Sequence, residues 1–172
     1  MSRSTSKLPA GAGRHPARQN LDSTTTREKR AQAGELVCKS CGAQYHEKHW
    51  YTIDQSLKFG DNAKMKETLC PGCYRVQNKI FNGRVVLQGS VLRDKPDELM
   101  KVIERVTHEC WLDNPTSQMF DVDKSDGQLE LKTTTEWLAT RIGKSLKRAY
   151  KGELHINSSP DKRNVDVVWN SH

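Results

Sequence analysis

The sequence is poor in apolar and aromatic residues for its length. Of its 172 residues, 34% are hydrophobic and 6% are aromatic, and both fractions are low for a globular protein. A segment with few apolar side chains cannot offset the loss of chain entropy on folding, so we expect part of the chain to be unfolded when alone. The length fits one or two compact units together with a tail.

Long hydrophobic runs are also missing. No apolar stretch approaches the roughly 18 residues that a membrane helix needs, and no apolar stretch of about 7 to 15 residues follows the N-terminus. We therefore expect neither a membrane span nor a secretory signal, and we expect a cytoplasmic protein. The arginine and serine content of the first residues would allow an organelle transit peptide, but glycines and prolines there interrupt the amphipathic helix that such a signal needs.

The formal net charge is +7, and it is unevenly distributed. Residues 1–35 carry +4, residues 36–81 carry +3, and residues 82–172 carry no net charge. The basic excess favours a polyanionic partner, and nucleic acid is favoured over a membrane because no segment resembles an amphipathic anchor. If four cysteines of the middle segment bound zinc as thiolates, its charge would fall to about +1. The N-terminal segment would then hold most of the excess.

Residues 1–35 form a predicted basic arm that is rich in Ser, Thr, Gly, Pro and Gln. We expect this arm to be disordered on its own. Such an arm either wraps phosphate groups or only aids solubility, and its composition favours the first function. The arm residues that we expect to contact RNA are Arg27, Lys29 and Arg30.

Four of the five cysteines form two CxxC pairs. Cys38 and Cys41 make the first pair, and Cys70 and Cys73 make the second pair after a spacer of 28 residues. A CxxC turn places two thiolates on one side of a tight loop, so two such pairs predict a closed structural Zn²⁺ site. Two disulfides or a redox-active CxxC are the alternatives, but neither a secretory context nor a βαβ pattern supports them.

Residues around the pairs refine this prediction. Gly42 and Gly72 are expected to take positive φ where the chain reverses over the metal. His46 and His49 lie near the first pair and could replace a thiolate, although four cysteines already complete a tetrahedron. A closed four-Cys site leaves no position for an activated water, and no other catalytic constellation is evident, so we expect no enzymatic activity.

The remaining sequence predicts a mixed set of strands and helices. The spacer predicts strands at 44–45 and 49–53, and then a polar stretch, 54–67, with a short helix or a loop. Beyond Gly83 the periodicity predicts, in order, strand 84–92, helix 96–112, strands 119–123 and 128–133, helix 136–151, and strands 153–157 and 164–169. The order β-α-β-β-α-β with one extra strand is the ferredoxin-like pattern, an antiparallel sheet with both helices on one face.

Single positions within these elements carry further expectations. Gly89 predicts a bulge or a close backbone approach in its strand. Thr134 or Thr135 would cap the second helix, and Gly152 would end it. Cys110 lies on the apolar stripe of the first helix and is predicted to be a core residue. The predicted domains are a disordered basic arm over 1–35, a zinc ribbon over 36–82 and a ferredoxin-like α+β domain over 83–172.

The second predicted helix carries a row of cations at helical spacing on one face. This row is either a solvated face with basic residues near a helix C-terminus or a ridge that binds phosphates, and the basic arm and zinc pairs keep the second function open. Trp50, Tyr51 or Tyr74 could likewise stack on unpaired bases or belong to the ribbon core. Outside the arm, the candidate RNA contacts are Arg75, Arg141, Lys144, Lys147, Arg148 and Lys151.

Four segments together carry a recognisable pattern: 38–42, 70–75, 133–144 and 149–154. They resemble a family of small bacterial four-Cys zinc-ribbon proteins, which is similar to the N-terminal zinc-binding region of the large-ribosomal-subunit export adaptor of archaea and eukaryotes. The resemblance covers roughly residues 36–156, and the TTT-xxLAxRIG stretch is its specific part. Through the adaptor it implies association with the ribosome or rRNA, but not export, because the adaptor's further domains are missing. The zinc ligands that it implies are Cys38, Cys41, Cys70 and Cys73.

These observations predict a non-enzymatic, zinc-containing RNA-binding protein. We expect it to associate with the ribosome, through rRNA or through ribosomal proteins. The alternative is a protein–protein adaptor with a structural zinc ribbon that does not bind nucleic acid.

Overall fold

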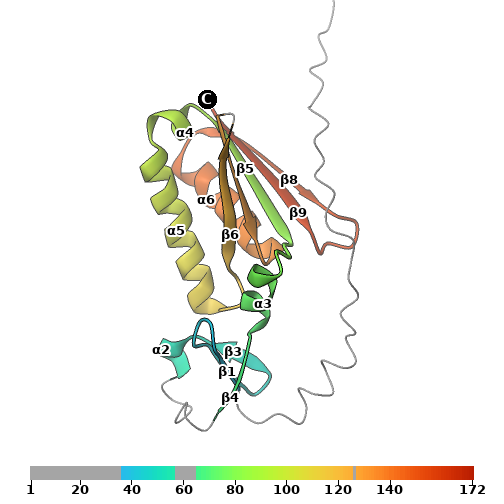
Figure 1. The fold of residues 1–172 in the computed structure, drawn as a ribbon. Coiled ribbons are helices and arrows are strands. Elements are labelled where there is room, and N and C mark those ends of the chain that lie inside the picture. Colours follow the sequence, from blue (N-terminus) through green and yellow to red (C-terminus); the bar gives the residue numbers. More distant parts are fainter. Residues whose placement is uncertain (1–35, 57–64, 126) are drawn as a thin grey trace, which may run out of the picture. The chain divides into compact units, whose positions relative to one another are not determined.

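A computed structural model of the protein describes residues 36–56, 65–125 and 127–172 (Figure 1). These residues all belong to one compact unit, Ala33–His172. They fold into two mixed β-sheets and five helices, so the predicted α+β class is confirmed. None of the described helices is long and apolar enough to cross a membrane. The predicted arm lies outside the described residues, together with its candidate RNA contacts Arg27, Lys29 and Arg30.

The smaller sheet lies next to the first CxxC pair. Its strands, in the order β3-β2-β1-β4, are β1 (Leu36–Cys38), β2 (Gln44–His46), β3 (His49–Tyr51) and β4 (Lys66–Thr68). β2 is antiparallel to β1 and β3, whereas β4 is parallel to β1. The strands predicted in the spacer are confirmed in position, except that Ile53 begins helix α2 (Ile53–Ser56). β4 overlaps the end of the predicted polar stretch, where the sequence shows no apolar alternation.

The larger sheet has five strands in the order β6-β7-β5-β9-β8. They are β5 (Gly83–Gly89), β6 (Met119–Ser125), β7 (Gln128–Thr133), β8 (Gly152–Ser158) and β9 (Val165–Ser171). Helices α5 (Pro96–Asp113) and α6 (Glu136–Ala149) cover one face of this sheet (Figure 1). Each strand and helix predicted beyond Gly83 is present, with bounds that differ by a few residues. The domain boundary at residue 82 stays a prediction.

The larger sheet is mixed, and the prediction of a wholly antiparallel sheet is wrong. β9 lies between β5 and β8, parallel to β5 and antiparallel to β8. The extra strand therefore separates two strands that are neighbours in a ferredoxin-like sheet, and that exact topology is not confirmed. The residue pattern explains the placement. β9 contributes Val165, Val167 and Trp169 to the core, whereas the edge strand β8 has no fully buried residue.

The strand predicted over 84–92 ends early because the chain changes direction at Gly89. Gly89 has a φ of +103°, and a Cβ there would lie 2.0 Å from the carbonyl oxygen of Ser171. This close backbone approach is the feature expected at this glycine. The residues that follow form helix α4 (Ser90–Asp94) instead of continuing the strand.

Helix α6 begins where it was predicted and ends sooner. Thr135 is its N-cap, and its side-chain oxygen accepts a hydrogen bond from the Leu138 amide at 3.3 Å. The chain becomes extended at Tyr150, so Lys151 lies beyond the helix. Gly152 begins β8 and does not end the helix, contrary to the prediction.

The main core lies between the larger sheet and helices α5 and α6. Cys110 is fully buried there, as predicted. Removing each large aliphatic side chain of such a core from water contributes about 1.5–3 kcal/mol, so this layer is the main source of stability. Its central members are Leu99, Ile103 and Val106 of α5, Leu138, Ile142 and Leu146 of α6, and Val85, Leu87, Leu131, Val167 and Trp169 of the sheet.

Candidate metal centre

The four predicted zinc ligands lie together. Cys38 ends β1, Cys41 lies in the turn that follows, Cys70 precedes helix α3 (Pro71–Gln77), and Cys73 lies in the first turn of that helix. Their four Sγ atoms lie within 4.8 Å of one another. The Sγ atoms of Cys41 and Cys70 are 3.7 Å apart, and tetrahedral zinc with Zn–S bonds of about 2.3 Å has sulfur–sulfur edges of about 3.8 Å. The cluster could therefore hold a metal ion in four-sulfur coordination.

The cluster contains neither a disulfide nor a histidine ligand, whereas a redox function of either CxxC pair stays an alternative. All five cysteines are free thiols, so the two CxxC pairs are not disulfides. Among the described residues the cluster consists of cysteines alone, and His46 and His49 do not belong to it. His46 lies 3.9 Å from Glu47, and the ring of His49 lies 6.4 Å from that of Tyr51.

The first CxxC pair is shaped by a tight turn. The amide of Cys38 donates to the carbonyl of Ala43 at 2.7 Å, and the amide of Gly42 donates to the carbonyl of Cys38 at 2.8 Å. Gly42 has a φ of +73°, which confirms the left-handed conformation predicted for it. The turn thereby places Cys38 and Cys41 on one side of the loop.

The second CxxC pair is shaped by the start of α3. The Sγ of Cys70 accepts a hydrogen bond from the amide of Cys73 at 3.4 Å, and the amide of Cys70 donates to the Sγ of Cys38 at 3.2 Å. The prediction of a positive φ at Gly72 is wrong, because Gly72 lies within this helix. Its missing side chain serves packing, since a Cβ there would lie 2.8 Å from the Cα and the carbonyl oxygen of Thr116.

Few apolar contacts hold the smaller sheet together. Its buried cluster is formed by three of the cysteines and Ala43, with Cys41, Trp50 and Leu69 packed against it. A core of this size cannot offset the chain entropy of the surrounding loops, so the sheet depends on a further source of stability. Trp50 is partly buried and packs against this cluster, while its stacking on an unpaired base stays a prediction.

Electrostatics inside the cluster also favour a bound cation. The hydrogen bond with Cys70 lowers the pKa of the Cys41 thiol to about 5. The same contact raises the pKa of Cys70, and burial raises the pKa of Cys73. Four adjacent sulfurs cannot all carry negative charge in the protein alone. A metal cation stabilises the thiolate form of every ligand and so removes this conflict.

Gln118 links the cluster to the larger half of the molecule. Its Nε2 donates to the Sγ of Cys73 at 3.4 Å and to the carbonyl of Pro115 at 2.9 Å. Its backbone amide donates to Oγ1 of Thr134 at 2.8 Å, and the amide of Thr134 donates back to its carbonyl at 2.9 Å. Sequence reasoning missed Gln118, because no motif marks a residue so far along the chain from the ligands.

The TTT stretch, residues 133–135, carries the family resemblance and contacts the residues that surround the second CxxC pair. Oγ1 of Thr134 donates to the carbonyl of Thr116 at 2.6 Å, and Thr135 caps α6. Nη1 of Arg75 donates to the carbonyl of Thr134 at 2.8 Å, so this half-buried guanidinium is engaged within the protein. An additional contact of Arg75 with RNA stays a prediction.

The residues of this centre and their partners are thus defined by geometry. Comparison of the chain with protein-family models, with curated proteins and with solved structures gives no match. What the chain binds is therefore inferred from its own residues.

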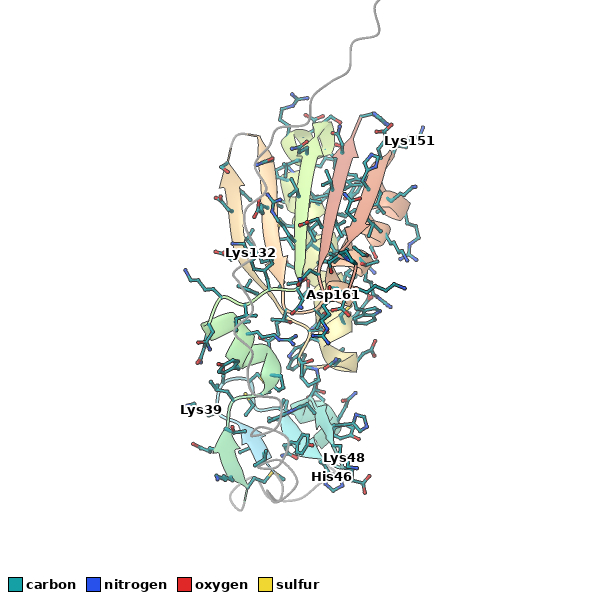
Figure 2. The ribbon with its side chains drawn as sticks, turned by 90° about the vertical axis from the view of Figure 1, so that its right-hand side faces the viewer. Lys39, His46, Lys48, Lys132, Lys151 and Asp161 are labelled. Carbon is teal, nitrogen blue, oxygen red and sulfur yellow. The ribbon has the colours of Figure 1, made fainter. Side chains whose placement is uncertain are left out.

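Exposed cations gather on the outer face of α6. Arg141, Lys144 and Arg148 follow one another at helical spacing there, and Lys147 flanks them. Arg141 lies 4.0 Å from Glu109, whereas the other three form no ion pair with any acid that the structure describes. Lys151 is exposed beyond the helix, next to β8 (Figure 2). We call Arg141, Lys144, Lys147 and Arg148 the α6 basic row.

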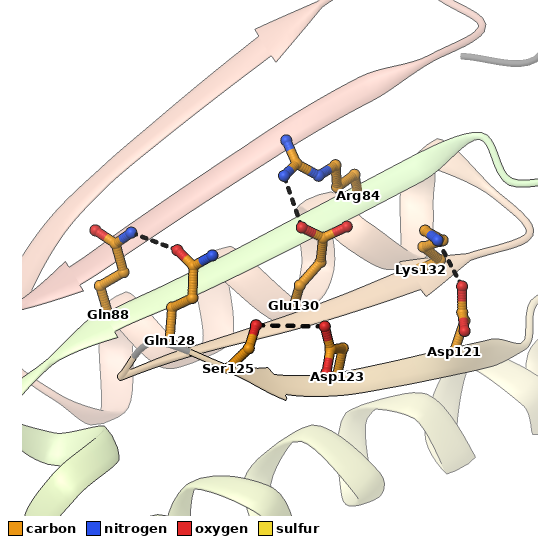
Figure 3. A network of polar contacts seen from close by, with 8 residues as sticks. All are labelled: Arg84, Gln88, Asp121, Asp123, Ser125, Gln128, Glu130 and Lys132. Carbon is orange, nitrogen blue, oxygen red and sulfur yellow. Dashed lines mark hydrogen bonds and ion pairs between the residues drawn. The ribbon is translucent and has the colours of Figure 1, made fainter. Parts of the chain in front are cut away.

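The face of the larger sheet opposite α5 and α6 (Figure 2) has a different character, because the charged side chains of β5, β6 and β7 there are largely paired (Figure 3). Nη2 of Arg84 lies 2.6 Å from Oε2 of Glu130, and this hydrogen bond lowers the pKa of the carboxyl group. Lys132 pairs with Asp121 in the same way and lowers its pKa. In the part of the chain that the structure describes, this face therefore offers no row of free cations, and the α6 basic row is the better candidate for contact with a polyanion.

Proposed function

We propose that this protein is a non-enzymatic, zinc-containing protein of the cytoplasm that binds RNA and associates with the ribosome, through rRNA or ribosomal proteins. The observation that carries the proposal is the α6 basic row, which concentrates cations on one helix face although residues 82–172 have no net charge. Phosphate groups would neutralise this row and release counterions. The resemblance to zinc-ribbon proteins points to the same partner.

The four cysteines are the residues that would hold Zn²⁺. The ion, when bound, supplies folding free energy to a sheet with little core of its own. Gln118 donates to the sulfur of Cys73, and Thr134 holds Gln118 in place through two hydrogen bonds. Because four protein ligands leave no open coordination position, we assign the centre a structural role and no catalytic step.

The RNA contact is electrostatic in this proposal. Each neutralised phosphate lowers the slope of log K against log salt by about 0.7 to 0.9. The binding of the full chain to ribosomal RNA, followed by fluorescence anisotropy over a salt series, should therefore give a steep line. The substitutions K144Q, K147Q and R148Q together should make the slope shallower by about 2 to 3.

A matched control removes the same charge from another place. Lys124, Lys162 and Arg163 are exposed and lie outside α6, so K124Q, K162Q and R163Q together should leave the slope nearly unchanged. If the two triple variants changed the salt slope equally, the basic row would contribute only through the net charge of the protein and would not be a specific RNA contact. A flat salt response of the unaltered chain would contradict RNA binding and favour the protein–protein adaptor.

A further inference from the structure

One exposed aromatic side chain lies next to the α6 basic row, one helical turn before Arg141. Trp137 is 42% exposed and is one of three large hydrophobic residues that are exposed among the described residues, with Ile53 and Val122. Helical spacings of four, three and four residues separate Trp137, Arg141, Lys144 and Arg148, so all of them share one helix face.

The fold does not account for Trp137. It does not belong to the buried core cluster, to which α6 contributes Leu138, Ile142 and Leu146. The helix start is already capped by Thr135. Among the described residues, the ring contact of Trp137 is with Arg141, whose guanidinium carbon lies 5.3 Å from the ring centroid. An exposed tryptophan with this environment is better explained by a ligand than by stability.

The charge around the ring indicates the chemistry of that ligand. Arg141 is weakly neutralised, because Glu109 lies 4.0 Å from it and also pairs with Arg105 at 3.2 Å. Lys144 and Arg148 have no acidic partner in the described part of the chain. An apolar protein segment would gain little from a ring that has Arg141 against it and further cations along the same helix face. A nucleotide offers both a planar base that stacks on tryptophan and phosphates that the cations neutralise.

We propose that Trp137 is the stacking platform for an unpaired nucleobase, with Arg141, Lys144 and Arg148 on the flanking phosphates. The partner class is RNA that presents an unpaired nucleotide, as in a bulge, a loop or a single strand. This inference rests on the proposed function and deepens it, because phosphate contacts alone would not distinguish paired from unpaired RNA. The stacking contact would favour RNA from which a base can be extruded.

The test compares three RNAs that differ in one nucleotide: a continuous duplex, the same duplex with a single-nucleotide bulge, and the bulged duplex with an abasic site at that nucleotide. The full chain should bind the bulged duplex at least about fivefold more tightly than either of the others. Trp137→Ala should remove this preference and change binding of the continuous duplex by less than about twofold. Trp137→Phe keeps an aromatic ring and should restore most of the preference.

Control variants separate the possible outcomes. Val122→Ala removes an exposed hydrophobic side chain outside α6 and should leave the preference unchanged, while K144Q and R148Q together should weaken binding of all three RNAs. If binding depends on salt but Trp137→Ala keeps the full preference for the bulged duplex, the stacking role is overturned and the proposed function stays intact. Absence of binding to every RNA would overturn both. Loss of a protein partner in Trp137→Ala, with RNA binding unchanged, would also overturn the stacking role.

Discussion

Gln118 is the polar residue that ties the four-Cys cluster to the rest of the protein. A donor to a ligand sulfur spreads the negative charge of the thiolate and fixes the direction of its lone pairs. The backbone and side chain of Gln118 are both held by other residues, Thr134 and Pro115, so its position does not depend on the sulfur contact alone. We therefore expect Gln118 to affect metal affinity without being a ligand.

Gln118→Leu keeps the approximate size of the side chain and removes its donor. The affinity for Zn²⁺ should fall by about 10-fold or more, because loss of such an outer hydrogen bond has an effect of this order at metal sites. Competition with a chromophoric chelator would measure the change. Gln128→Leu is the matched control, since Gln128 bonds Gln88 on the sheet at 2.8 Å and does not touch the cysteines. Equal affinities of the two variants would contradict the role of Gln118.

At the scale of elements, helix α3 packs against the loop over 114–118, and this contact connects the metal centre to the larger half of the protein. Gly72 of α3 lies directly against the backbone of Thr116, and Arg75 of the same helix bonds the carbonyl of Thr134. This interface is therefore made by close backbone packing and by hydrogen bonds to main-chain groups. Such contacts tolerate little change in volume.

Gly72→Ala tests this packing. The added Cβ would lie 2.8 Å from the Cα and carbonyl oxygen of Thr116, and neither atom can move without shifting the backbone. We expect the free energy of unfolding to fall by about 1–3 kcal/mol, the usual effect of overpacking. Chemical denaturation followed by circular dichroism would measure it. Gly127→Ala separates overpacking from backbone strain: nothing lies within 4 Å of a Cβ there, so a loss of about 1–2 kcal/mol in that variant would come from its φ of +72° alone.

Local patterns predicted the elements of the larger half but not their arrangement. Helix α5 follows from the spacing of Leu99, Ile103, Val106 and Cys110, and strands β6 and β7 follow from their place on either side of the Asp-Gly turn signal at 126–127. The position of β9 between β5 and β8 depends on pairing between distant strands, which no local period encodes. Of the site, the CxxC spacing predicted the four ligands because it is a local signal. Gln118 contacts Cys73, from which it is 45 residues away in the sequence, so no local pattern predicts its role.

At the scale of the molecule, the two halves differ in what stabilises them. The larger sheet and helices α5 and α6 enclose a continuous apolar core, whereas the smaller sheet has a small cluster made mostly of cysteines. A structural Zn²⁺ can contribute on the order of 10 kcal/mol to a small module. The metal should therefore control the order of the smaller sheet and of α3. Its effect should reach the start of α6 through Gln118 and the TTT stretch.

Metal removal is the test of this division. A chelator should strip the zinc and abolish hydrogen-exchange protection of amides in β1 and α3, including Cys38, while amides of β5 and β9 stay protected by the main core. The amide of Leu138, bonded to Thr135 at the start of α6, should lose part of its protection. Lowering the pH should act in the same direction, because each thiol must give up its proton to bind the metal.

The cysteines provide a matched pair of variants for the same measurement. Cys70→Ser removes a ligand and should abolish stoichiometric zinc together with protection of β1 and α3. Cys110→Ser makes the same chemical change in the core between α5 and the sheet, so it should lower global stability yet retain one zinc per chain. Full zinc content in Cys70→Ser would contradict the assignment of the centre. Collapse of protection in β5 and β9 on chelation would instead show that the larger half depends on the metal as much as the smaller sheet does.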